Sequence, residues 1–60
     1  MYFKLIYNPA PRAGYHARLY NASGQLLFWT HDYKTKQQAV DICAEVRRNM
    51  RSDAPIYDVD

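Results

Sequence analysis

One amphipathic helix, expected over residues 36–50, constrains most strongly what this chain can fold into. Thr35 and Gln38 have the spacing of a capping box, which marks a helix start. Three arginines crowd the last turn, where cations interact favourably with the helix dipole. Apolar residues recur between these ends at three- and four-residue steps: Ala39, Ile42, Cys43, Val46 and Met50. Because 60 residues leave room for one such helix, this stripe must cover a sheet formed by the rest of the chain.

Period-two alternation predicts three strands before the helix, over residues 2–7, 15–21 and 25–31. Gly24 closes a three-residue hairpin loop between the second and third strands, at a position that favours a positive φ. After the helix, a Ser-Asp-Ala-Pro stretch breaks it and residues 56–59 are expected to form a short strand. The predicted order is therefore β-β-β-α-β, in a single domain over residues 1–60.

The hairpin loop also determines which residues share a sheet face. It pairs Leu19 with Leu27 and Ala17 with Trp29, so these four side chains are expected on one face. Together with the helix stripe, this register predicts a core of Phe3, Leu5, Leu19, Leu27, Trp29, Ala39, Cys43 and Val46.

The chain is small for a domain that folds alone. At this length only roughly 60% of the unfolded surface can be buried, and small domains usually rely on disulfides, a metal or a partner chain. Cys43 is the only cysteine, which excludes an internal disulfide, so we expect a homodimer. The lone terminal strand needs a sheet edge, either in its own sheet or in that of a second copy. Exchange of a terminal element is a low-cost route to a dimer.

Several features of the sequence predict the cellular location of the protein. Its N-terminal residues lack the apolar core and cleavage site of a signal peptide. No run approaches the ~20 apolar residues of a membrane span, so no membrane partner is expected. A lone cysteine on a helix suits a reducing cytosol, which predicts a cytoplasmic location. The net charge of +2 does not by itself predict nucleic-acid binding.

An ordered set of residues, spread over nearly the whole chain, resembles the YegP-like family of small bacterial domains of unknown function. The matching positions are Phe3, Leu19, Gly24, Leu27, Thr30 (for a serine), Tyr33, Lys36, Ala39, Val46, Arg47, Asn49 and Tyr57-Asp58. Ile42-Cys43 departs from the Gly-Ile usual in mid-helix, and Ala17 and Trp29 exchange the usual aromatic and small residue. The resemblance implies a β-β-β-α-β unit in which two copies form one continuous sheet with exchanged C-terminal strands.

No group of residues predicts an enzyme, a cofactor or a metal. Cys43 lies on the apolar stripe, where a free cysteine is usually a small buried hydrophobe. His16 and His31 lack ligand spacing with it and are interpreted as surface histidines. The acidic residues near the C-terminus are interpreted as electrostatic partners of the helix arginines across a dimer; they are Asp53, Asp58 and Asp60.

The sheet face without the helix is the one surface that suggests binding. Its candidate residues are Lys4, His16, Arg18, Tyr20 and Phe28, with Ile6 and Leu26 beside them. Single-stranded nucleic-acid binders stack bases on such aromatic residues between cations. An ordinary solvated face explains the same pattern, as does contact with a protein partner. We place the solvated face first, a protein partner second and nucleic acid last.

The prediction is an α+β domain: an antiparallel sheet with one helix packed on one face. It forms a dimer with exchanged C-terminal strands. Ile56, Tyr57 and Val59 are the predicted dimer contacts. The expected function is a non-enzymatic interaction module, and the alternative is weak single-stranded nucleic-acid binding through the helix-free face.

Overall fold

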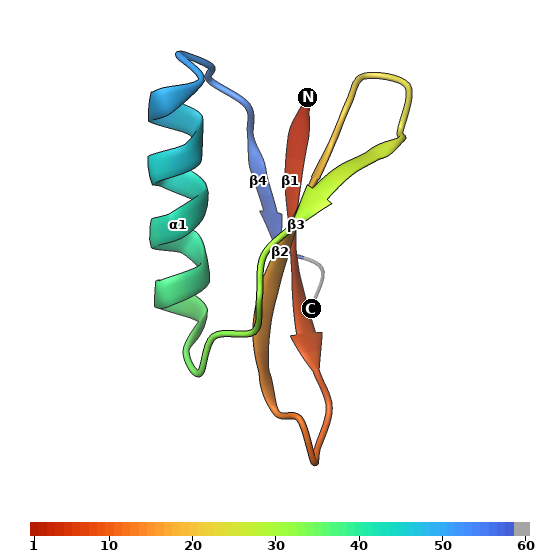
Figure 1. Ribbon diagram of the computed structural model, residues 1–60, viewed down its shortest axis with the longest axis vertical. Coiled ribbons are helices and arrows are strands. Elements are labelled where there is room, and N and C mark those ends of the chain that lie inside the picture. The colour runs from red at the N-terminus through yellow and green to blue at the C-terminus, as the bar shows by residue number, and fades with distance from the viewer. Residues whose placement is uncertain (59–60) are drawn as a thin grey trace.

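The computed structural model describes residues 1–58 and confirms an α+β domain with one helix on one face of a sheet (Figure 1). The chain order is as predicted. The elements are β1 (Tyr2–Asn8), β2 (Gly14–Tyr20), β3 (Leu26–Trp29), α1 (Lys36–Asn49) and β4 (Ile56–Asp58).

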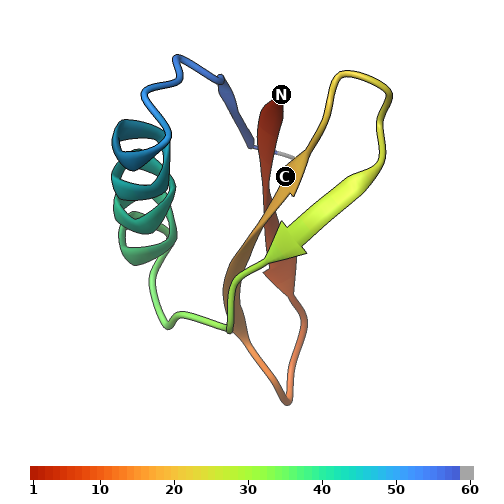
Figure 2. The ribbon, with the colours of Figure 1, turned by 45° about the horizontal axis from the view of Figure 1, so that its top comes forward.

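The sheet is mixed, which corrects the expectation of a wholly antiparallel sheet. Its strand order is β3-β2-β1-β4. β1 pairs antiparallel with β2, and β2 with β3, but β4 runs parallel to β1. The helix is the reason: it carries the chain from one sheet edge over β2 and β1 to the other, so β4 runs in the same direction as β3 and β1. Figure 2 shows this crossover from β3 to β4. β4 thus occupies an edge of its own sheet in this structure.

The helix packs on β2 and β1 and buries a small core. Thr35 caps its first turn: its hydroxyl accepts a hydrogen bond from the Gln38 amide at 3.2 Å, and the Gln38 side chain accepts one from the Thr35 amide at 3.3 Å. The buried hydrophobic residues are Phe3, Leu5, Ala17, Leu19, Ala39, Cys43 and Ala54, with Val40, Val46 and Ile56 packed against them. The capping box and the helical contribution to the core are therefore confirmed.

The predicted β2–β3 register is wrong by one residue. Asn21 still pairs with Gln25, and Gly24 has the expected positive φ of 87°. A β-bulge then shifts the pairing, so that Arg18 faces Trp29. A one-residue shift moves each later side chain of the strand to the other sheet face.

The bulge removes two residues from the predicted core. Leu27 is 46% exposed, and Trp29 is 66% exposed on the face away from the helix. Phe28, which faces Leu19, lies on the helix face instead. The short β3 therefore contributes little to the core, which consists mainly of side chains from β1, β2 and α1.

A close backbone contact closes the sheet at the start of β2. Tyr15 and Tyr33 form an isolated antiparallel bridge, with N–H to C=O distances of 2.7 and 2.6 Å. A Cβ atom at Gly14 would lie 2.6 Å from the Tyr33 carbonyl oxygen, so this position requires glycine. The bridge fixes the segment between β3 and α1 against the sheet.

The C-terminal strand is attached at both ends. The Phe3 amide donates to the Pro55 carbonyl at 2.9 Å, and Lys36 forms an ion pair with Asp58. Within one chain, Asp58 thus pairs with Lys36, and its predicted contact with arginines across a dimer stays a prediction. Of the predicted dimer contacts, Ile56 is half-buried and Tyr57 is exposed, while Val59 lies outside the described residues.

Candidate binding face

The face of the sheet opposite α1, called the open face below, brings cations and aromatic rings together. Its residues follow from the strand registers: Tyr2, Lys4, Ile6, His16, Arg18, Tyr20, Leu26, Trp29 and Tyr57. Four of the five predicted binding residues lie on it, and Phe28 does not. Trp29 takes the place that was expected for Phe28, as a consequence of the bulge in β3.

One row of the open face crosses all four strands. Tyr57 pairs with Lys4, Lys4 with Arg18, and Arg18 with Trp29. Two cations thus stand side by side in the middle of the sheet, with an exposed aromatic ring at each edge. Like charges directly opposite each other on neighbouring strands destabilise a sheet. Neither cation forms an ion pair within the described residues 1–58.

The ammonium group of Lys4 rests over two aromatic rings. Its Nζ lies 5.3 Å from the ring centre of Tyr20 and 5.9 Å from that of Tyr2. These two rings stack on each other at 5.2 Å, and Tyr57 meets Tyr2 edge-on at 6.0 Å. The cation is attracted to the negative faces of the rings, which holds the lysine near the sheet.

A chain of polar contacts surrounds His16 in the middle of the open face. The Arg18 Nε donates to His16 Nε2 at 3.2 Å. Because Nε2 must then accept, the neutral ring carries its proton on Nδ1, which donates to Asn8 Oδ1 at 3.0 Å. The Asn8 amide in turn donates to Asp32 Oδ1, 2.6 Å away. Arg12 meets the same carboxylate at 3.7 Å, so the chain connects two arginines.

His16 is 9% exposed, which corrects its interpretation as a surface histidine. Burial and the nearby charge of Arg18 lower its pKa, and Asp32, 3.6 Å from Nδ1, raises it less. The ring is therefore neutral at pH 7, as its hydrogen bonds require. A neutral His16 can accept from Arg18 and so orients the guanidinium.

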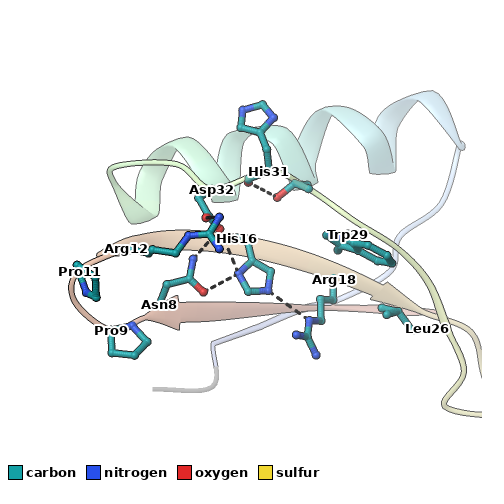
Figure 3. Close-up of a pocket in the computed structure, with 11 residues that line it drawn as sticks. Asn8, Pro9, Pro11, Arg12, His16, Arg18, Leu26, Trp29, His31 and Asp32 are labelled. Carbon is teal, nitrogen blue, oxygen red and sulfur yellow. Dashed lines mark hydrogen bonds and ion pairs between the residues drawn. The ribbon is translucent and has the colours of Figure 1, made fainter.

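A groove of about 690 Å³ lies along this part of the open face (Figure 3). Trp29, Leu26 and Arg18 line one end, and the β1–β2 turn with Arg12 and Asp32 lines the other. His16 lies between the two ends. Sequence reasoning missed Asn8, which ends β1 before a proline-rich turn, and Asp32, which follows β3. Only the β1–β2 pairing and the Tyr15–Tyr33 bridge bring them beside His16.

Of the two remaining candidates, His31 lines the groove, and Cys43 lies elsewhere, in the core. Cys43 is 1% exposed, and burial raises the pKa of its thiol to about 11, as suits a core residue. The ring of His31 packs against the ring of Tyr33, with 4.4 Å between the ring centres. Among residues 1–58, no three His, Cys, Asp or Glu side chains gather as metal ligands would. Over the same residues, no helix has the length and apolar character to cross a membrane.

The fold and site define a small α+β domain with one helix-covered and one open sheet face. Residues 12–58 match the family described as Domain of unknown function (DUF1508), to which the YegP-like proteins belong. The chain is a member of this family, and the resemblance seen in the sequence is confirmed. Comparison with curated proteins and with solved structures gave no significant match.

Proposed function

We propose that this domain is a non-enzymatic interaction module that works as a homodimer with exchanged β4 strands. The interaction role rests on one observation: β3 is an edge strand whose four residues, Leu-Leu-Phe-Trp, are all exposed. Their exposed fractions run from 38% for Phe28 to 66% for Trp29. An apolar edge with unpaired backbone groups is a template for a further strand. β3 therefore accepts an extended apolar segment of a protein partner by strand addition.

The exchange of β4 is supported by how the strand is attached. Within residues 1–58 it forms three pairs with β1, and it follows a short connection from the helix. Its contacts with Phe3 and Lys36 can be made equally by the β4 of a second copy, so exchange conserves them. A dimer joined at these edges leaves both β3 strands free on the outside of the combined sheet.

Light scattering at micromolar concentration tests the dimer. The full chain is expected at the mass of two copies, and deletion of residues 55–60 is expected to abolish the dimer. The double variant Leu26→Lys, Phe28→Lys should remain dimeric, because β3 is not the dimer edge. A folded monomer of the full chain rules out exchange, and a monomeric double variant moves the interface to β3.

Single-stranded nucleic-acid binding on the open face is the second candidate function. It is favoured by the row in which Lys4 and Arg18 stand between the exposed rings of Tyr57 and Trp29. Bases stack on exposed rings with little regard to sequence, while neighbouring cations neutralise phosphates.

A labelled oligonucleotide titrated at two salt concentrations tests this second function. Binding should weaken at higher salt, since counterions compete for the phosphates. Arg18→Ala combined with Trp29→Ala should abolish it. Phe28→Ala is the matched control, because Phe28 lies on the helix face and its loss should leave binding unchanged. Salt-independent binding contradicts this function.

A further inference from the structure

Two neighbouring cations on the open face, Lys4 and Arg18, have no acidic partner within residues 1–58. Lys4 and Arg18 are direct cross-strand partners, and no acidic side chain pairs with either within residues 1–58. Lys4 contacts two tyrosine rings, and Arg18 uses only its Nε, toward His16. The terminal nitrogens of Arg18 form no hydrogen bond in the described chain. Arg18 lines the groove, and Lys4 is its cross-strand neighbour on β1 without being a lining residue, so the pair carries a positive charge of two at this end of the groove.

The guanidinium of Arg18 is held in place before any ligand arrives. Its Nε is fixed by the buried ring of His16, which is itself held by Asn8, and Asn8 by Asp32. This series of hydrogen bonds begins on β1 and β2 and ends in the segment after β3, so three parts of the fold determine where Arg18 points. A preorganised arginine loses little side-chain entropy on binding and offers its remaining donors to two oxygens of one anion.

A flat apolar surface lies next to these donors. Trp29 stands directly across from Arg18 and is 66% exposed, and Leu26 lines the groove beside it. Figure 3 shows both side chains at the same end of the groove as Arg18. An indole face of this kind stacks on a planar ring. The groove volume of about 690 Å³ lies within the range of small-molecule sites, roughly 300–1,000 Å³.

The other end of the groove limits how many anionic groups the ligand can carry. Asp32 lies there, and although Arg12 faces it, that arginine is 83% exposed and 3.7 Å away. A second phosphate reaching this end meets a carboxylate, whereas a hydroxyl or amino group can donate to it. Charge and shape thus select a ligand with one anionic end and one neutral, hydrogen-bonding end.

We infer that this groove is a binding site for a small planar ring that carries a single phosphate monoester, such as a nucleoside monophosphate. The ring stacks on Trp29, and the phosphate lies against Arg18 with Lys4 beside it. A phosphate monoester carries about −1.5 to −2 charges at pH 7, which matches the two cations. The site does not depend on the proposed dimer, because every residue in it belongs to one chain.

The test uses adenosine 5′-monophosphate as the probe and the fluorescence of Trp29, the only tryptophan, as the readout. Adenosine 5′-monophosphate is expected to quench the fluorescence saturably. It should bind at least about tenfold more tightly than adenosine, because adenosine lacks the phosphate and so loses a charge-assisted contact. Inorganic phosphate alone should leave the fluorescence nearly unchanged. Arg18→Gln should weaken binding about tenfold or more, whereas Arg48→Gln, on the exposed helix end, is the matched control and should bind normally.

Amide chemical shifts of the unaltered chain provide a check that needs no variant. Residues 16–18 and 29–32 should shift on titration, and the helix should not. Adenosine that binds as tightly as its monophosphate overturns the inference, as does an unaffected, folded Arg18→Gln. Binding of an oligonucleotide without any binding of the monophosphate also overturns it and leaves nucleic acid as the ligand of the open face.

Discussion

The two faces of the sheet are built from the same strands and stabilised in different ways. On the helix face, Phe3 and Leu19 of the sheet and Cys43 of α1 are each 1% exposed where the helix packs on the sheet. On the open face, His16 is 9% exposed; its Nδ1 donates a hydrogen bond to Asn8 Oδ1, and its Nε2 accepts one from Arg18 Nε. Apolar burial therefore stabilises one face, and a chain of directed polar contacts organises the other.

Under the proposed binding role of the open face, this difference separates stability from recognition within a very small domain. Hydrophobic contacts on the helix face are non-directional and tolerate small shifts. The polar chain on the open face places one guanidinium in a defined orientation, which contributes little to folding but suits a ligand. Substitutions on the helix face should therefore change the free energy of unfolding most, and substitutions on the open face should change binding most.

Truncation of one aromatic residue on each face gives the largest expected contrast. Phe3→Ala should lower the free energy of unfolding by about 3–5 kcal/mol, because a fully buried ring is replaced by a cavity. Trp29→Ala removes a larger ring that is 66% exposed and should cost less than about 1 kcal/mol. Urea unfolding followed by far-UV circular dichroism measures both.

Both variants must be compared at one protein concentration, because association shifts apparent stability. Equal losses would remove the distinction between the faces. They would mean that Trp29 is covered in solution, which would favour a partner chain over the open face.

The Gly14 contact tests whether the open face also depends on one close backbone approach. Gly14→Ala places a Cβ atom 2.6 Å from the Tyr33 carbonyl oxygen, so the bridge must move. We expect a loss of about 1–3 kcal/mol in the free energy of unfolding, as for other overpacked sites. Hydrogen exchange at the Tyr15 and Tyr33 amides should rise most, because these two form the bridge.

Gly24→Ala is the matched control for this glycine. Gly24 has a φ of 87°, and a Cβ atom there would make an ordinary contact with the Tyr2 hydroxyl at 3.9 Å. Its substitution should cost about 1 kcal/mol through backbone strain alone. Hydrogen exchange at the Tyr15–Tyr33 bridge should stay slow. If Gly24→Ala is the more damaging of the two, the close contact at Gly14 is not what closes the sheet.

The helix and the helix-face core were predictable because local signals agree with one another. Thr35 and Gln38 mark the helix start, and the three- and four-residue spacing that includes Ala39 and Cys43 marks its buried side. The β1–β2 core residues followed from simple alternation. The error at Trp29 has a physical cause: Leu27 is an additional residue in the strand, and no local sequence signal distinguishes a bulge from a continuous apolar strand.

The candidate site was only half predictable for the same kind of reason. Lys4 and Arg18 were placed on the open face by alternation, which depends on neighbours in sequence. The environment of His16 depends on Asn8, eight residues away, and on Asp32, sixteen residues away. Contacts at such separations follow from the turn geometry and the Tyr15–Tyr33 bridge, which one sequence does not reveal.

Removal of the helix cap tests whether the two faces are energetically independent. Thr35→Ala should lower the free energy of unfolding by about 1 kcal/mol, because the Gln38 amide loses its acceptor. Thr35→Ser keeps the hydroxyl and is the matched control. Chemical shifts of His16 and Arg18 should not change in either variant, since the polar chain does not touch the helix. Shifts there would couple the two faces.

The smallest expected effect is a pH dependence that arises on the open face. The pKa of His16 is lowered by burial and by Arg18, despite the opposing charge of Asp32, and Asn8 is its uncharged neighbour. Between this lowered pKa and about 6.5, the unfolded chain binds more protons than the folded one. The free energy of unfolding should therefore fall as pH drops below about 6.5 and become level below the folded pKa.

Urea unfolding from pH 7.5 to 5 measures this fall, which His16→Gln should remove and His31→Gln should leave in place. If the free energy of unfolding of His16→Gln still falls with pH, another group takes up the proton. The series of polar contacts around His16 would then not be what stabilises the open face.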